Sequence, residues 1–220
     1  SMARLASGLR VNSAKADAAG LAIAERMNAQ IRGMNVAIRN ANDGISYAQV
    51  AEGALSKMGD SLQRMRELAI QARNASNTER DQDSLQNEFK ELQSEIDRVL
   101  KGTTFNGSTI FTATGSLDFQ VGAGTTGNDR VSIVLGNTAL TADASLTSVT
   151  TTTAIIGDLG TTTAVAGSAI DAVIGSIDAA LDKINSQRSV WGATQNRFDA
   201  VISNLQVSVE NQAAARSRIM

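Results

Sequence analysis

Apolar side chains recur at helical spacing through residues 17–74, a stretch that contains no proline. From Met27 to Ala69, successive apolar positions are separated by three or four residues, with a mean of about 3.5. That is the coiled-coil period, and it is shorter than the 3.6 residues per turn of a straight helix. The stripe therefore predicts one helix, about 87 Å long at about 1.5 Å per residue, that supercoils left-handedly around a partner. Its positions are Met27, Ile31, Met34, Ile38, Ala41, Ile45, Ala48, Ala51, Leu55, Met58, Leu62, Met65 and Ala69.

Two further stretches carry the same pattern. Residues 78–101 begin with a possible cap at Thr78–Asp81. Their apolar stripe is Leu85, Phe89, Leu92, Ile96 and Val99. This predicts a second helix that packs back on the first as an antiparallel hairpin. Residues 168–220 carry the same spacing, and Arg188 and Gln195 interrupt an otherwise apolar seam. The seam positions are Ile170, Ile174, Ile177, Leu181, Ile184, Arg188, Trp191, Gln195, Phe198, Ile202, Leu205 and Val209.

The first long helix contains glycines that weaken it. Each glycine costs about 0.5–1 kcal/mol relative to alanine, so we interpret some of them as sites where another backbone approaches closely. The alternative is an exposed helix that tolerates weak residues. The glycines are Gly20, Gly33, Gly44, Gly53 and Gly59.

A short amphipathic piece in residues 1–12 precedes a bend, after which Ser13 or Asp17 is the expected N-cap of the first long helix.

The middle of the chain changes from helical to extended character. Asn106-Gly107 is a hairpin turn signal, and residues 117–121 and 131–135 are predicted to pair as strands around a turn at 122–129. Residues 137–167 are rich in Thr, Ala, Ser and Gly. Because such a stretch has little to bury, we expect a surface excursion with at most short strands or a short helix.

These elements predict a mainly α protein with a small β part: an elongated antiparallel coiled-coil rod of three helices with a β-hairpin region at the tip. The expected divisions are residues 1–102 for the N-terminal part of the rod, with helices at about 17–74 and 78–101, then 103–167 for the hairpin and the Thr-rich region. Residues 168–220 form the C-terminal helix that completes the rod.

Composition narrows the classes of function. The chain has no Pro, Cys or His, so it lacks an imidazole base, a thiolate nucleophile and soft metal ligands. We therefore predict that it is not an enzyme and has no catalytic residue, cofactor or metal site. A formal net charge of −2 without clustered Lys or Arg argues against nucleic-acid binding. The apolar runs are far shorter than the roughly 20 residues that cross a bilayer, so no membrane partner is expected.

Several strings, in order along the chain, resemble bacterial flagellin. The resemblance covers residues 3–121 and 170–220, and the Thr-rich middle corresponds to the variable outer region of that family. Ala16 departs from the pattern, since the family usually has a second acid beside Asp17 there. The strings are Ser7-Gly8-Leu9-Arg10-Val11-Asn12-Ser13-Ala14-Lys15, Asp17-Ala18-Ala19-Gly20, Arg39-Asn40-Ala41-Asn42-Asp43-Gly44-Ile45-Ser46, Leu62-Gln63-Arg64-Met65-Arg66-Glu67-Leu68-Ala69-Ile70-Gln71, Phe105-Asn106-Gly107, Gln195-Asn196-Arg197-Phe198 and Ala215-Arg216-Ser217-Arg218-Ile219.

The resemblance implies a self-assembling structural subunit of the flagellar filament, which serves motility and is extracellular. Its implied partners are other flagellin subunits and the flagellar export and capping proteins. Flagellins have further residues at both ends that form an inner tube, so the chain resembles a core fragment, and we expect this fragment to be monomeric.

The resemblance also implies sensing by the Toll-like receptor that recognises flagellin, part of innate immune recognition. The matching receptor-binding positions are Arg64, Leu68, Glu88, Ile177 and Leu181. The charged pair would otherwise be ordinary solvated surface, and the three apolar residues would be core.

Two other classes of function compete with this interpretation. A helical binding or signalling rod, such as a chemoreceptor-like hairpin, shares the period but needs neither the Asn-Asp-Gly-Ile-Ser string nor a β-hairpin. An enzyme carried on a filament would need catalytic groups in residues 102–167. That segment offers only scattered acids without a supporting base, namely Asp118, Asp129, Asp143 and Asp158.

Overall fold

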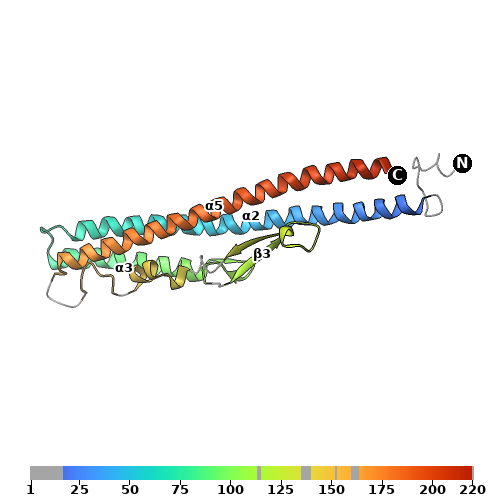
Figure 1. Ribbon diagram of the computed structural model, residues 1–220. Helices are drawn as coiled ribbons and strands as arrows, with labels where there is room; N and C mark the ends of the chain where they lie inside the picture. The colour runs from blue at the N-terminus through green and yellow to red at the C-terminus, as the bar shows by residue number, and fades with distance from the viewer. Residues whose placement is uncertain (1–16, 113–114, 135–139, 152, 160–163, 220) are drawn as a thin grey trace. The chain divides into compact units, whose positions relative to one another are not determined.

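The computed structural model describes residues 17–112, 115–134, 140–151, 153–159 and 164–219 (Figure 1). The predicted short piece at residues 1–12 and the possible cap Ser13 lie outside them. Three helices dominate: α2 (Ala18–Ala72), α3 (Glu79–Gly102) and α5 (Gly167–Ile219). The predicted mainly α fold with a small β part is confirmed. The shorter elements are β1 (Thr104–Phe105), β2 (Ser108–Thr109), β3 (Ser116–Gln120), η1 (Gly127–Asp129), β4 (Arg130–Val134), η3 (Leu140–Ala142) and α4 (Ala144–Thr150).

Side chains near the helix starts act as predicted. The Gly20 amide donates to Asp17 Oδ1 over 2.8 Å, so Asp17 caps α2. Thr78 and Asp81 form a capping box at the start of α3, because each side chain accepts a hydrogen bond from the backbone amide of the other. These caps supply partners for amides that have none inside a helix.

The described residues form two compact units, and both α2 and α5 contribute to each. The first unit contains residues 17–46, 118–133 and 194–219, and the second contains residues 47–117 and 134–193. Each unit therefore combines segments from the beginning, middle and end of the chain.

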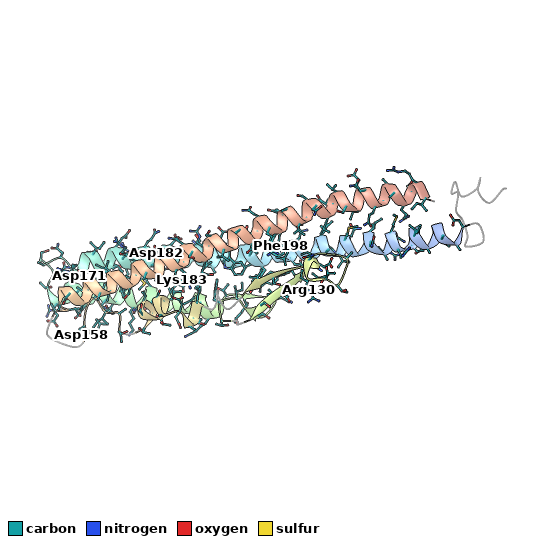
Figure 2. The ribbon with its side chains drawn as sticks, in the orientation of Figure 1. Arg130, Asp158, Asp171, Asp182, Lys183 and Phe198 are labelled. Carbon is teal, nitrogen blue, oxygen red and sulfur yellow. The ribbon has the colours of Figure 1, made fainter. Side chains whose placement is uncertain are left out.

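In the first unit α2 and α5 run antiparallel, since Asn28 bonds to Arg216 while Gly44 lies against the Phe198 ring (Figure 2). A Cβ at Gly44 would come within 2.5 Å of that ring, so a close approach requires glycine there. Gly33 likewise lies against Ala123, at 2.9 Å from a built Cβ. The prediction that another backbone closely approaches some helix glycines is confirmed at Gly33, whereas the close neighbour of Gly44 is a side chain.

The strands β3 and β4 pair, as predicted, and pack beside α2 within the first unit. Asn40 Nδ2 donates to the Gln120 carbonyl over 2.9 Å, and the Phe119 ring meets Phe198 edge-on at 5.4 Å. Because Asn40 lies inside α2, the hairpin lies along the helix rather than beyond its end.

In the second unit the predicted coiled-coil seam is the core. Leu55, Met58, Leu62 and Met65 of α2 are buried together with Phe89 and Ile96 of α3 and Ile177 and Ile184 of α5. Ion pairs from Arg66 to Asp178 and from Arg73 to Asp171 show that α2 and α5 are antiparallel here too. The predicted three-helix packing is confirmed within this unit.

The β1–β2 hairpin confirms the Asn106-Gly107 turn. Thr104 pairs with Thr109 and Phe105 with Ser108, and the two turn residues have φ values of 49° and 80°. Positive φ at both central positions is the type I′ geometry that an Asn-Gly turn favours. The hairpin places the Phe105 ring 5.3 Å from Tyr47.

Two details of the seam differ from the sequence prediction. On α3 the buried positions are spaced four, three, four, three and four apart, whereas Leu85, Leu92 and Val99 are only half-buried. On α5 the seam passes through buried Gln187, and the predicted interrupter Arg188 is exposed. The predicted seams were drawn from apolar residues alone, so they missed the polar residues that occupy core positions. The α3 seam is Gln82, Gln86, Phe89, Gln93, Ile96 and Leu100.

The prediction that the Thr-rich region has little to bury is wrong for its described part. The region does contain only short helices, as expected, but Leu140, Leu146, Val149 and Ile156 are each at most 1% exposed. A few well-spaced apolar residues are enough to attach the segment to the second unit, because the remaining polar side chains stay outside.

Candidate functional site

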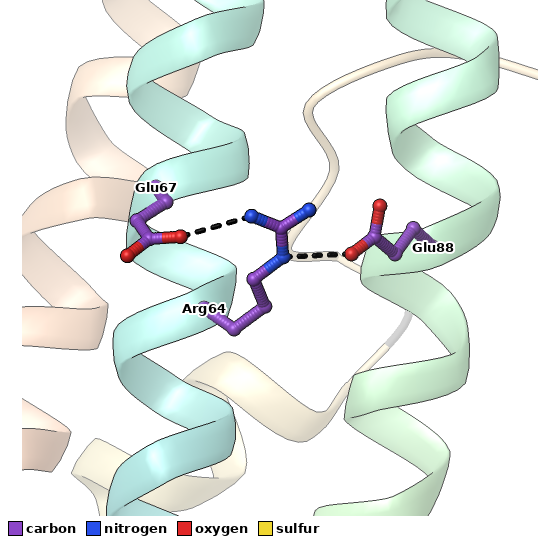
Figure 3. Close-up of polar contacts among 3 residues, drawn as sticks. All are labelled: Arg64, Glu67 and Glu88. Atoms are coloured by element: carbon purple, nitrogen blue, oxygen red, sulfur yellow. Dashed lines mark hydrogen bonds and ion pairs between the residues drawn. The ribbon is translucent and has the colours of Figure 1, made fainter.

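The candidate site is the α2–α3 surface of the second unit, and Arg64 lies at its centre (Figure 3). Arg64 Nε donates to Glu88 Oε1 on α3 over 2.8 Å, and its NH1 donates to Glu67 Oε2 one turn along α2 over 2.9 Å. The side chains of Arg64 and Glu88 are about half exposed, and that of Glu67 is 67% exposed. The sequence-predicted pair Arg64 and Glu88 is therefore brought together, on neighbouring helices, at the surface.

The arrangement follows from helix geometry. Residues three apart lie on the same helix face, so Arg64 and Glu67 meet without help from the rest of the fold. Glu88 reaches Arg64 only because Phe89, its neighbour on α3, is buried and sets the rotation of that helix. The hydrogen bond to Glu88, followed by the one to Glu67, raises the pKa of the Arg64 guanidinium above its ordinary value.

The three apolar residues predicted for the site lie at different depths. Leu68 is 1% exposed and Ile177 is 0% exposed, so both are part of the core of the second unit. Leu181 is half-buried. The accessible part of the predicted set is thus Arg64 and Glu88, with Leu181 partly accessible.

A groove in the same unit lies between residues 53–61 of α2 and residues 95–103 at the end of α3, and none of Arg64, Glu67 and Glu88 lines it. It has a volume of about 430 Å³, and apolar Met58 and Ile96 form part of its wall. Lys57, Asp60, Glu95 and Arg98 also line it. Paired charges around a modest apolar floor suit a contact with a protein surface rather than a chemical reaction.

The sequence prediction missed a set of polar residues in the same unit, the three buried glutamines of α3. Gln86 Oε1 accepts from the amides of Ile156 and Gly157 over 2.8 and 3.2 Å. Gln93 Nε2 lies 2.7 Å from the Val149 carbonyl. The available signal was the four-three spacing of Gln82, Gln86 and Gln93 with Phe89, Ile96 and Leu100, visible only if glutamine is counted as a core residue.

Among the described residues, no group of three or more His, Cys, Asp or Glu side chains is placed to hold a metal ion. Within the same part of the chain, no helix is long and apolar enough to span a bilayer. The site therefore consists of a charged surface supported by a helical core.

An antiparallel helical core with exposed paired charges is typical of structural and interaction proteins. Residues 1–116 match the family model of the bacterial flagellin N-terminal helical region, and residues 174–220 match that of the bacterial flagellin C-terminal helical region. The chain belongs to the bacterial flagellin family, and it is a structural subunit of the flagellar filament, the extracellular part of the flagellum.

Individual relatives agree with this assignment. The chain is 44% identical to a flagellin of Halalkalibacterium halodurans over 219 residues, which cover 99% of this chain and 75% of that protein. It is 40% identical to a Bacillus subtilis flagellin, covering 99% of this chain and 78% of the relative. Its fold is similar to the crystal structure of Bacillus cereus flagellin, with a TM-score of 0.60, 27% identity, and coverage of 81% and 94% of the two chains. The family favours a structural subunit over the signalling rod considered above.

Proposed function

We propose that the chain assembles with further copies of itself into the flagellar filament after export by the flagellar secretion apparatus, with capping proteins aiding assembly at the growing end. The observation that carries this proposal is that α2 and α5, which belong largely to the two family-matched regions, pack antiparallel along one seam. A subunit built from both ends of its chain completes its core only after the whole chain has emerged.

The composition supports a protein that folds after export. The chain has neither cysteine nor proline. Disulfide formation and proline isomerisation are among the slowest folding events, and neither would delay this chain. Its helical contacts can therefore form soon after export.

Filaments sheared from the source organism test assembly directly. Mass spectrometry should identify this chain as a principal filament protein, and deletion of its gene should reduce swimming, with recovery on complementation. Filaments of normal length that contain none of the chain would refute the proposal.

We propose further that the Toll-like receptor for flagellin contacts the surface around Arg64 and Glu88. An exposed guanidinium held by two carboxylates is a preorganised polar anchor, and Arg is enriched among residues that dominate interfaces. Buried Leu68 and Ile177 would support this surface from below, and half-buried Leu181 would contribute a smaller contact.

Replacing Arg64 with Ala should raise the concentration needed for half-maximal signalling in receptor-bearing reporter cells by tenfold or more. Arg32→Ala is the matched control, because Arg32 is also an exposed arginine of α2 but lies in the first unit, away from the α2–α3 surface. Both variants should keep the helical circular dichroism of the parent. Equal signalling by Arg64→Ala, Arg32→Ala and the parent would remove the receptor assignment.

A further inference from the structure

The second unit contains a polar seam, which we call the glutamine dock: Gln82, Gln86 and Gln93 of α3. All three side chains are at most 6% exposed. Buried amides are costly unless their donors and acceptors are satisfied. Their partners therefore show what the dock holds.

Each glutamine of the dock bonds to main-chain atoms. Gln86 Oε1 accepts from two amides, those of Ile156 and Gly157. Gln93 Nε2 lies 2.7, 3.2 and 3.1 Å from the carbonyl oxygens of Val149, Thr151 and Ala154.

Gln82 connects two parts of the chain by its two amide atoms. Its Oε1 accepts from the Val165 amide over 2.9 Å, and its Nε2 donates to the Ala72 carbonyl at the end of α2 over 3.1 Å. The described part of the Thr-rich segment is thus bonded to α3 through main-chain groups. Every residue type provides the carbonyl oxygen, and every type except proline provides the amide hydrogen.

The side-chain requirements of the segment are few. Leu146, Val149 and Ile156 are fully buried. Gly157 lies so close to α3 that a Cβ there would come within 2.3 Å of the Gln82 carbonyl oxygen, which is a backbone atom with little room to move.

The threonine and serine hydroxyls of α4 do not bond to α3. Thr147, Ser148 and Thr150 donate to carbonyls of their own segment, at Asp143, Ser145 and Leu146. Ala142 and Ala144 are exposed, whereas Thr153 shares a hydrogen bond with Thr151, and Leu159 lines a cavity with Gln86 and Gln93. The contacts with the dock thus leave outward side chains such as those of Ala142 and Ala144 unbound.

We propose that the glutamine dock holds the described part of residues 140–165 through its main chain, so that the outward side chains there can change without loss of docking. Attachment of the segment to α3 then does not depend on which side chains the segment carries at its surface. A segment with small apolar anchors and a glycine at position 157 meets its requirements whatever its outer residues are.

Residue-resolved hydrogen exchange on the full chain tests this, because the amides of Ile156 and Gly157 are direct reporters of Gln86. In Gln86→Leu both amides should exchange at least tenfold faster than in the parent. Gln63→Leu, the same change at an exposed glutamine of α2, is the matched control and should leave both rates within twofold. The double variant Ala142→Gln, Ala144→Gln, at two exposed positions of the segment, should also leave both rates within twofold.

Protection of Ile156 and Gly157 that survives in Gln86→Leu would overturn the proposal, as would an equal loss of protection in the double variant. Amides of Leu62 and Met65 in the core reveal any general loss of stability. If the Leu62 and Met65 amides also exchange faster in Gln86→Leu, the variant Gln86→Glu separates a lost hydrogen bond from a general loss of stability. Its carboxylate oxygen still accepts hydrogen bonds. The two reporter amides should be slower to exchange in Gln86→Glu than in Gln86→Leu, and equal rates would refute the dock.

A substitution in the Thr-rich segment that blocks its close approach to α3 tests the same attachment. Gly157→Ala should increase the exchange of Ile156 and Val165 at least tenfold, since the added Cβ meets the α3 backbone. Gly53→Ala is the control, because a Cβ at Gly53 meets nothing within 4 Å. Unchanged exchange at Ile156 in Gly157→Ala would contradict the close docking on which the proposal rests.

Discussion

Phe89 is the side chain on which the packing of α3 most depends. It is fully buried, it lies midway along the α3 seam, and its position fixes the direction in which Glu88 points. Its burial was predicted from the sequence because an aromatic residue stood at the expected helical spacing. Family resemblance placed Glu88 and Arg64 on one receptor-binding face, but their ion pair was not predicted, since a single exposed acid gives no sign of its partner.

Truncation of Phe89 to Ala should lower the free energy of unfolding by about 3–5 kcal/mol, the usual cost of removing a buried aromatic ring. Urea denaturation followed by circular dichroism measures this, with Lys90→Ala as the exposed neighbouring control. A midpoint equal to that of the control would show that Phe89 does not contribute to the core.

The capping carboxylate Asp81 gives a pH-dependent prediction. The Thr78 hydroxyl and then the Thr78 amide hold the pKa of Asp81 below its ordinary value of about 3.9. A depressed pKa stabilises the folded state above the ordinary value, and this stabilisation is lost as pH falls through the folded-state pKa. The stability difference between the parent and Asp81→Ala should therefore be larger at pH 7 than at pH 3. Asn87→Ala, a non-titrating exposed change on the same helix, should show no such trend.

The elements differ in how far local sequence decides them. The three long helices and the Asn106-Gly107 turn were predicted closely, because period, caps and turn residues are local signals. The α3 seam was predicted only in part, since Gln82, Gln86 and Gln93 look like surface residues until their partners in the Thr-rich segment are known. The docking of that segment depends on contacts between residues more than fifty positions apart, such as Gln93 with Val149. No periodicity along the chain reports such contacts.

Donor and acceptor roles in the α3 seam predict the effect of one charged substitution. Gln93→Glu removes the amide donor, so at pH 7 a carboxylate would face three carbonyl oxygens, and stability should fall by about 1–3 kcal/mol or more. The introduced carboxyl can donate only when protonated, so its folded-state pKa should lie above the ordinary value of about 4.3. The destabilisation should be smallest below that value and grow as pH rises through the folded-state pKa. Gln63→Glu on the α2 surface should show neither the loss nor the trend.

At the scale of the molecule, the surface explains why single contacts between copies should be weak. Exposed large hydrophobic residues occur singly along the sequence in the described ranges, as at Val36, Ile70 and Val207. Several surface charges are paired within the chain, as in Arg66 with Asp178, and the net charge is only −2. Single exposed apolar side chains are ordinary on monomers and surface ion pairs contribute little free energy, so neither gives two molecules a strong drive to associate.

Association of two copies must offset a loss of translational and rotational freedom worth at least about 4 kcal/mol. In a filament each subunit contacts several neighbours, so weak contacts add together, whereas a pair in dilute solution has one contact only. The 220-residue chain at micromolar concentration and near-physiological salt should therefore be a monomer. Light scattering coupled to size exclusion should give a mass near 23.0 kDa that does not change on tenfold dilution. A larger mass that persists on dilution would mean that one pairwise interface is strong enough alone, and charge reversal at Arg64 would then show whether the α2–α3 surface forms it.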